Sequence, residues 1–338
     1  MNASSPVEMI CGTVMLKMLE PFHIAGYVFR DSPAFVVTLE QDGHVGRGEA
    51  SGVYYLDDRP ESMAARLEPL RERIRAGMSR EELRAELPPC GARNALDCAM
   101  WELEAKRTGT SVRELAGLPP LRRLLTTMTL GADEPEVMAR KALAYGQARA
   151  LKLKLTGDAA LDIRRVHAVR SARPDVWMGV DANQGYTGDL LPELIKGLRE
   201  ARVSLLEQPC RRGHESELDG ISREIPIAAD ESVQDLDELE ALAERFDVVN
   251  IKLDKCGGLT EGLLIAARAK QLGLGVMVGN MLGTSLAMAP AFILGQQCDV
   301  VDLDGPLFIT NDRKPSVTYV DGYIDCADAV WGTPESLA

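Results

Sequence analysis

The chain has 338 residues, of which 46% are hydrophobic and 26% are charged, as in an ordinary water-soluble globular protein. The formal net charge of −13 argues against a nucleic-acid-binding surface, which would be basic and clustered. The longest apolar runs stop well short of the ~20 residues that a membrane helix needs, and the N-terminus lacks the pattern of a signal peptide. We therefore expect a cytoplasmic protein without nucleic-acid or membrane partners.

Residues 1–120 predict strands followed by helices. Two apolar runs on either side of residues 41–43 (Gln-Asp-Gly) favour a β-hairpin with a tight Asp-Gly turn. Ser79 and Glu82 form an S-x-x-E capping box that opens a short helix. A longer amphipathic helix is expected over 92–108, with Gly109 just beyond its end. We expect this segment to form an α+β unit.

Over residues 121–310 the pattern changes to strand, turn and helix, repeated. Apolar segments end in polar residues at positions 154, 181, 207, 230, 252, 280 and 302. A βαβ unit takes roughly 30 residues, so this spacing predicts parallel strands with return helices. The first strand is expected at 126–131, and helices are expected at 134–148, 159–172, 188–201, 234–245 and 260–272. Side chains at the strand ends of such a closed barrel point into one mouth.

Three consecutive strands of this series end in acids, namely Asp181, Glu207 and Asp230. Three carboxylates without His or Cys suit a hard cation that prefers oxygen, so we predict a Mg²⁺ site in which Mn²⁺ can substitute. A single acid at such a position often caps a helix. Three acids at the ends of consecutive strands, at similar spacing along the sequence, favour metal ligation instead.

Two lysines, Lys154 and Lys252, end the second and sixth strands, on opposite sides of the predicted mouth. A substrate carboxylate held by the metal would have one lysine on each face of its α-carbon, which suits removal and return of an α-proton. The metal stabilises the enolate, and neighbouring positive charge favours a neutral lysine base. Because side chains alternate along a strand, Lys152 points to the same side as Lys154. It is better placed to neutralise the charge of the enolate than to remove the proton.

The motifs resemble those of the enolase superfamily, muconate lactonizing enzyme subgroup. They are K-x-K at 152–154, D-A-N at 181–183, E-Q-P at 207–209, D-E-S at 230–232 and N-I-K-L-x-K-x-G-G at 250–258. The resemblance implies an α/β fold, a modified TIM barrel (β/α)₇β over 121–310. It also implies an α+β capping domain over 1–120, completed by the C-terminal tail 311–338.

The resemblance also implies roles for single residues. Asp181, Glu207 and Asp230 would be the metal ligands, and Lys154 and Lys252 the acid–base pair. Lys152 would be the cation on the enolate side, and Asn183 and Glu231 would support the ligands.

The eighth strand ends in a D-x-D, and period two places Asp302 and Asp304 on one face. Two carboxylates suit a substrate ammonium group. The D-x-D is similar to that of dipeptide epimerases, which hold the free amino terminus of a dipeptide. We therefore expect inversion of the C-terminal α-carbon of an L,L-dipeptide by two-lysine 1,1-proton transfer through a metal-stabilised enolate. Asn280, at the end of the seventh strand, is a further expected substrate contact.

The side-chain preference stays open. If Phe29, Tyr54 and Tyr55 face the substrate, a hydrophobic side chain fits, and if Asp57 or Asp58 does, a cationic one fits. If the Arg30 side chain turns towards the substrate, a glutamate side chain fits, as in the Ala-Glu epimerases. The resemblance to those enzymes suggests murein-peptide metabolism.

Three other functions were weighed. A lyase of the same superfamily, such as o-succinylbenzoate synthase or a cycloisomerase, is disfavoured because the D-x-D would repel its carboxylate-bearing substrate. Racemisation of acylamino acids is disfavoured because the substrate nitrogen is a neutral amide. A non-catalytic metal-binding relative would not need both lysines. The oligomeric state is left open, with a homo-oligomer as one option.

Overall fold

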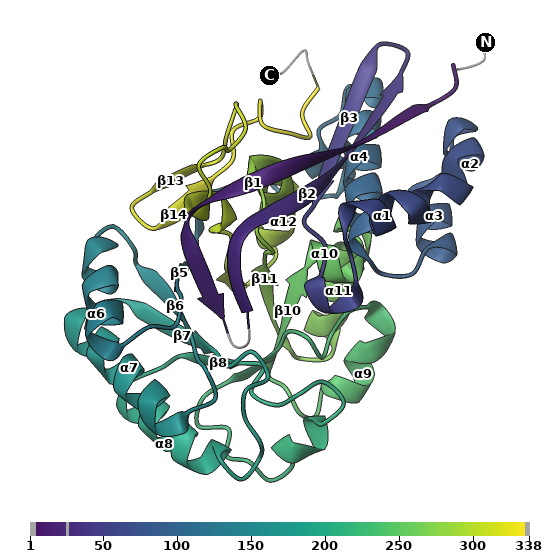
Figure 1. Ribbon diagram of the computed structural model, residues 1–338. Coiled ribbons are helices and arrows are strands. Elements are labelled where there is room, and N and C mark those ends of the chain that lie inside the picture. The colour runs from purple at the N-terminus through teal and green to yellow at the C-terminus, as the bar shows by residue number, and fades with distance from the viewer. Residues whose placement is uncertain (1–4, 25–26, 335–338) are drawn as a thin grey trace.

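The computed structural model describes residues 5–24 and 27–334, with the backbone alone for 22–24, 27–29 and 54. In Figure 1 an N-terminal antiparallel sheet lies against a group of helices, above a curled parallel sheet whose own helices cover its outer side. No helix in the described ranges has the length and apolar character needed to cross a membrane.

The N-terminal sheet has the order β1-β2-β3, with β1 (Glu8–Ile24), β2 (Tyr27–Gln41) and β3 (His44–Ala50) all antiparallel. The expected Asp-Gly turn joins β2 to β3: Asp42 and Gly43 have φ of 52° and 82°, as a two-residue hairpin turn requires. Gly48 of β3 faces the long helix of the domain so closely that a Cβ there would lie 2.0 Å from the carbonyl oxygen of Ala95. Glycine at this position therefore sets how near sheet and helix come.

Two of the capping helices, α3 (Arg80–Glu86) and α4 (Gly91–Thr108), were expected from the sequence, and the other helical elements there were not. The capping box of Ser79 and Glu82 opens α3, and α4 runs to Thr108, where Gly109 ends it with φ of 68°. Fourteen residues of this second helix are buried, because it lies between the N-terminal sheet and the barrel. The helical elements are η1 (Tyr54–Leu56), α1 (Pro60–Leu67), η2 (Glu68–Leu70), α2 (Arg71–Arg75), α3 (Arg80–Glu86), α4 (Gly91–Thr108) and α5 (Val112–Leu115).

Eight parallel strands form the barrel in sequence order, and the backbone N–H of Thr127 donates to the carbonyl of Val301 at 2.9 Å, joining the first strand region to the last. The strands are β5 (Met128–Leu130), β6 (Ala150–Lys154), β7 (Trp177–Asp181), β8 (Leu205–Glu207), β9 (Ile227–Ala229), β10 (Val248–Lys252), β11 (Gly275–Gly279) and β12 (Val300–Val301). All seven strand-end positions used in the sequence argument lie at the carboxyl ends of these strands.

Helices occupy the five expected ranges to within a few residues, and besides two one-turn segments one longer helix was not expected. The helical elements between the strands are α6 (Pro135–Ala144), α7 (Ala159–Ala172), α8 (Leu191–Glu200), η3 (Glu215–Leu218), η4 (Leu236–Glu238), α9 (Leu239–Leu242), α10 (Leu253–Cys256), α11 (Leu259–Gln271) and α12 (Ser285–Gly295). The unexpected helix is α12, which is apolar on every side and contains Pro290, so it has no amphipathic period to detect.

The barrel interior is layered. Its lower layer is an apolar cluster of Leu205, Ala228 and Met277, with Trp177, Val248 and Val300 beside them. Two residues further along, four of these strands carry a charged or polar residue, and the other two carry glycine; the four are Glu207, Asp230, Asn250 and Asp302. The apolar floor therefore places the polar groups above it at the carboxyl end of the barrel.

The C-terminal tail adds a small antiparallel sheet, in which β13 (Thr318–Val320) and β14 (Tyr323–Asp325) join β4 (Leu124–Leu125). The tail and the residue just before it, Thr310, also contact the N-terminal sheet. The backbone N–H of Thr310 donates to the carbonyl of Lys17 at 2.8 Å, and the indole N–H of Trp331 donates to the carbonyl of Arg47 at 2.8 Å.

Cap and barrel meet at a buried carboxylate. Asp254, just after β10, accepts the backbone N–H of Gly52, in the loop after β3, at 2.8 Å. Burial, together with the nearby carboxylates of Asp58 and Glu49, raises the pKa of Asp254 to about 7. An acid with a raised pKa binds its proton more tightly in the folded than in the unfolded chain, so its contribution to stability is lost as pH rises from about 4 to 7.

The variant Asp254→Asn removes this titration and keeps an acceptor for Gly52. Relative to the parent, its free energy of unfolding should therefore increase by about 2–3 kcal/mol between pH 5 and pH 8. Urea unfolding curves of the parent and the variant at pH 5, 6, 7 and 8 measure this difference in the free energy of unfolding. The exposed Asp328→Asn serves as the control, with no such trend. A parent–variant difference that is constant over this range contradicts the assignment.

Candidate active site

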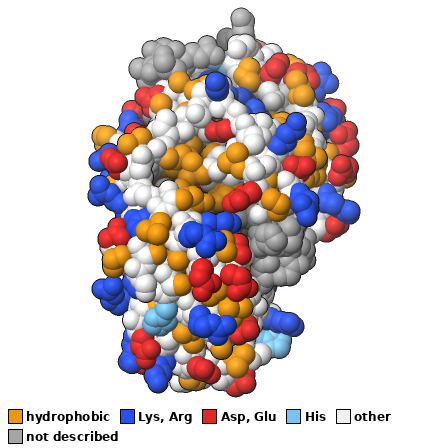
Figure 2. Space-filling view, turned by 60° about the vertical axis from the view of Figure 1, so that its left-hand side comes forward, with side chains coloured by type: hydrophobic (Ala, Val, Ile, Leu, Met, Phe, Trp, Pro, Cys, Tyr) orange, Lys and Arg blue, Asp and Glu red, His pale blue; other side chains and the backbone are white. Residues whose placement is uncertain are grey.

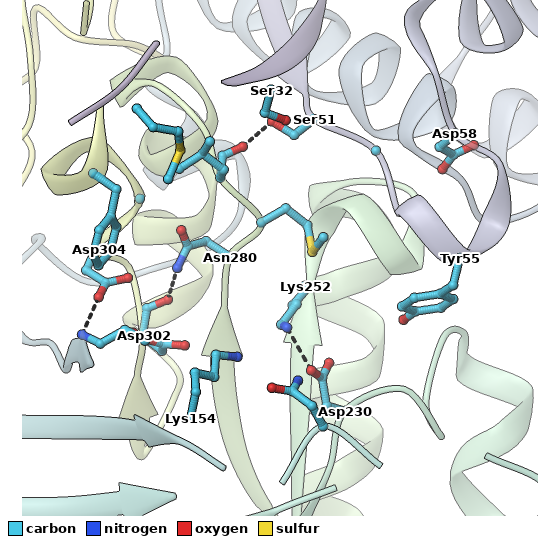
Figure 3. Close-up of a pocket in the computed structure, with 18 of the residues that line it drawn as sticks. Ser32, Ser51, Tyr55, Asp58, Lys154, Asp230, Lys252, Asn280, Asp302 and Asp304 are labelled. Atoms are coloured by element: carbon cyan, nitrogen blue, oxygen red, sulfur yellow. Dashed lines mark hydrogen bonds and ion pairs between the residues drawn. The ribbon is translucent and has the colours of Figure 1, made fainter. Parts of the chain in front are cut away.

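A cavity of about 470 Å³ opens at the carboxyl ends of the barrel strands, below the cap. Figure 2 shows a face hollowed near its centre, with hydrophobic side chains gathered along the hollow. In the close-up, Lys154, Lys252 and Asp230 come from the barrel side, while Ser51 and Tyr55 come from the cap side (Figure 3). The cavity therefore has walls from both parts of the chain.

The three predicted metal ligands lie together. Asp181 ends β7, Glu207 ends β8 and Asp230 follows β9, and one carboxylate oxygen from each lies within 4.8 Å of the others. All three are buried, and in the described part of the chain no other cluster of His, Cys, Asp and Glu is so compact. Three buried carboxylates at this spacing are a donor set of the kind that Mg²⁺ prefers.

Three lysines surround these carboxylates. The ammonium of Lys154 lies 2.6 Å from Asp181 Oδ2, and that of Lys252 lies 2.7 Å from Asp230 Oδ2. Lys152 lies deeper and contacts three acids: Glu207 Oε2 at 2.8 Å, Asp302 Oδ2 at 2.9 Å and Asp181 Oδ2 at 3.2 Å. Lys154 and Lys252 both line the cavity, so each can reach a molecule bound there.

The charges of this cluster depend on one another. Although burial opposes it, the acids around Lys152 raise the pKa of that lysine well above its usual value, and Asp230 does the same to Lys252. Burial and the neighbouring Asp181 raise the pKa of Glu207 to about 8. The pairing carboxylate thus stabilises the ammonium form of Lys252, whereas the sequence-based expectation of a neutral base includes the positive charge of a bound metal.

The two residues expected to support the ligands are also present. The backbone N–H of Asn183 donates to Asp181 Oδ1 at 2.9 Å, and Asn183 adopts a positive φ of 43°. Burial, with Asp230 beside it, raises the pKa of Glu231 to about 7, and Glu231 Oε2 has no hydrogen-bond partner in the described structure. Both side chains line the cavity.

The D-x-D of the last strand lines the cavity, but its two acids have different surroundings. Asp302 accepts the Thr127 hydroxyl at 2.5 Å on one oxygen and the Lys152 ammonium at 2.9 Å on the other. Asp304 accepts the backbone N–H of Thr129 at 2.7 Å, and burial together with Asp302 raises its pKa to about 7. The charge of Asp302 is therefore compensated within the protein, whereas Asp304 forms no ion pair with any described residue.

Among the expected substrate contacts, Asn280 lines the cavity and donates its amide N–H to the carbonyl of Asp302 at 2.5 Å. Arg30 is exposed and is not one of the described cavity-lining residues. The side chains of Phe29 and Tyr54 lie outside the described residues.

Sequence reasoning left several residues unassigned. Arg59, Met281 and Leu282 line the cavity, and Arg59 is paired with Asp57 at 3.0 Å. Loops of this kind carry no periodic signal. Two further residues, Asn250 and Lys255, contact the acid cluster from below. Their place in the motif at 250–258 is the sequence feature that could have identified them.

Comparison with protein families and with known proteins agrees with this arrangement. Residues 7–117 match the family model described as mandelate racemase/muconate lactonizing enzyme, N-terminal domain, and residues 136–330 match the one described as enolase C-terminal domain-like. An L-Ala-D/L-Glu epimerase of Escherichia coli is 37% identical over 89% of this chain and 94% of its own length. An N-acetyl-D-glutamate racemase of a Pseudoalteromonas species is 40% identical over 75% of this chain and 80% of its own.

Two solved structures are similar over nearly the whole chain. An enolase family member from Agrobacterium tumefaciens, with homology to dipeptide epimerases and bound to sodium and L-Ala-L-Glu, has a TM-score of 0.93 at 36% identity, covering 97% of this chain and 100% of that one. A dipeptide epimerase from Methylococcus capsulatus, complexed with Mg and L-Arg-D-Lys, has a TM-score of 0.88 at 29% identity, covering 96% and 97%.

These similarities confirm the expected capped, modified TIM barrel. Both family models together span most of the chain, and the relatives align with it along most of their lengths. The chain belongs to the mandelate racemase/muconate lactonizing enzyme family of the enolase superfamily.

Proposed function

We propose that the protein is a Mg²⁺-dependent dipeptide epimerase that inverts the α-carbon of the C-terminal residue. The observation that carries this proposal is the convergence of Lys154 and Lys252 on one cavity, beside three buried carboxylates. Relatives and similar structures named as dipeptide epimerases support it, as does the Mg that one of them contains.

In this proposal Asp181, Glu207 and Asp230 hold the Mg²⁺, which stabilises the negative charge that develops on the substrate carboxylate. One lysine, Lys154 or Lys252, takes the α-proton on its Nζ as a free amine, and the other returns a proton to the opposite face as an ammonium. Lys152 does neither, because its ammonium stays among three carboxylates. Its fixed positive charge stabilises anionic forms of the substrate.

The substrate amino group is assigned to Asp304 in particular, because both oxygens of Asp302 already have protein donors. We expect Asp304→Asn to raise the KM for dipeptides by about 10–100-fold with a smaller effect on kcat, since a charge-assisted contact contributes roughly 1.5–3 kcal/mol. Initial rates over a range of dipeptide concentrations measure this change. An unaltered KM removes the ammonium assignment.

A second function is favoured by one observation. Since Lys152 compensates the charge of Asp302, the last strand offers less uncompensated negative charge to a substrate ammonium group than the sequence alone predicts, and it therefore disfavours a neutral amide less. The N-acetyl-D-glutamate racemase relative makes N-acyl amino acids the alternative substrate class. For such substrates Asp304→Asn should leave KM nearly unchanged, which separates the two functions.

The test of function is a screen in D₂O with Mg²⁺, using a library of L,L-dipeptides and a matched set of N-acetyl amino acids. Epimerisation replaces one α-proton by deuterium, so mass spectrometry reads the activity and the side-chain preference together. A gain of one mass unit in a group of dipeptides supports the epimerase. Exchange in N-acetyl amino acids alone supports the alternative, and exchange in neither contradicts both.

We also propose three finer assignments. The chain divides into a capping domain (1–120), a catalytic barrel (121–310) and a tail (311–338) that contacts the capping domain. The acidic net charge and the lack of basic clusters suit a cytoplasmic enzyme without nucleic-acid partners, as a monomer or homo-oligomer. Dipeptides released from murein are the physiological substrates that the Ala-Glu relatives suggest.

A further inference from the structure

Asn250 is a polar side chain enclosed inside the barrel. It lies on β10 two residues before Lys252, so both point inward, and its exposed fraction is 0%. Val248, two residues before it, packs against the apolar floor of the barrel. Asn250 therefore lies between that floor and the reacting groups, and it is not one of the described residues that line the cavity.

The amide of Asn250 reaches a predicted metal ligand on another strand. Its Nδ2–H donates to Glu207 Oε1 at 2.9 Å, although β9 lies between β8 and β10. The β9 residue paired with Glu207 is Ala228, whose methyl group leaves the inward space open. On the other side, a Cβ on Gly279 would lie 2.7 Å from Asn250 Oδ1. Small residues on both flanking strands thus make room for this contact.

Glu207 has a second partner, but that partner is shared. Lys152 donates to Glu207 Oε1 at 2.9 Å and also contacts Asp181 and Asp302. A flexible ammonium divided among three acids does not define the plane of any one carboxylate. A planar amide fixed inside a strand does, because among the described residues it hydrogen-bonds to Glu207 alone.

We propose that Asn250 is a positioning residue, whose amide holds the Glu207 carboxylate in the orientation that a divalent cation needs. It acts through Glu207 and touches neither substrate nor cation. The inference rests on the metal site of the proposed function. Partners that orient a metal ligand in this way typically contribute 10–100-fold to metal affinity.

The experiment measures Mn²⁺ binding alone, without substrate, by titrating metal-free protein and following free Mn²⁺ by electron paramagnetic resonance. The variant Asn250→Leu replaces the amide by an apolar group of similar size and unchanged charge. Asn250→Ser, a smaller change, decides the question if the leucine variant does not fold. We expect a dissociation constant at least 10-fold weaker for both.

The matched control is Asn94→Leu, which alters another buried asparagine, in α4, away from the acid cluster. It should bind Mn²⁺ within two-fold of the parent, even if its melting temperature falls. Folded Asn250 variants that also bind within two-fold overturn the role of Asn250 and leave the proposed function standing. A parent that binds no Mn²⁺ overturns the metal site itself.

Discussion

Replacing Lys252 by alanine should reduce epimerisation by at least about 1,000-fold, and Lys154→Ala should do the same. Proton transfer by a positioned side chain contributes roughly 10²–10⁴-fold, and inversion needs one such group on each face of the α-carbon. No described residue can substitute: Lys152 is 3% exposed and surrounded by acids, and Lys255 is 1% exposed and does not line the cavity. Conversion of an L,L-dipeptide, followed by chiral chromatography, measures the loss.

The single variants also carry a more specific expectation. Each should retain the base for one epimer, so it should exchange the α-proton of that epimer for deuterium without forming the other. The two variants should differ in which epimer they exchange. Mn²⁺ binding and circular dichroism check that site and fold persist, and the exposed Lys270→Ala is the matched control. Near-normal turnover in both variants would falsify the two-base assignment.

The second large effect concerns stability. The ammonium of Lys255 lies 2.6 Å from Asp230 Oδ1, donates to the carbonyls of Val233 and Asn250 at 3.1 Å each, and also donates to the carbonyl of Asp230. Lys255→Met removes this donor from all of these buried acceptors, and of the carbonyl groups that of Asp230 keeps the backbone N–H of Val233. Removing one partner of a buried ion pair costs about 3–5 kcal/mol, so we expect a loss of this size in the free energy of unfolding.

Urea unfolding at pH 7.5 in the presence of EDTA measures this loss without any contribution from bound metal. Lys270→Met, an exposed lysine of α11, makes the same chemical change and should alter stability by less than about 0.5 kcal/mol. A loss below about 1 kcal/mol for Lys255→Met would mean that the surrounding acceptors find other donors.

The barrel was predictable because polar residues recur at the ends of apolar segments, at a nearly regular spacing. Period two and the spacing from 154 to 302 locate the inward, strand-end side chains without knowledge of packing. The helix α12 was not predictable in this way, because a segment that is apolar on every side has no period. The hairpin at Asp42 and the helix end at Gly109 were predictable from turn and cap chemistry, which is local.

The site was predictable in its acids and lysines but not in the differences among them. Lys252 and Lys255 are three residues apart in one motif, yet one faces the cavity and the other is enclosed by carbonyls. Likewise Asp302 and Asp304 both line the cavity, and only the three-dimensional structure puts Lys152 beside the first. Such differences depend on residues from other parts of the chain: the groups that enclose Lys255 lie up to 25 positions away, and Lys152 lies 150 positions from Asp302.

The contacts between the tail and the N-terminal sheet have a consequence for synthesis of the chain. The carbonyl of Arg47 receives its donor from Trp331, 284 residues later. At roughly 5–20 residues per second on the ribosome, that partner is made about 14–57 seconds after the strand it completes. The donor for Lys17 on β1, Thr310, comes almost as late. Until then this edge strand has unpaired backbone groups, so a nascent or truncated chain without the tail is exposed to strand-to-strand aggregation.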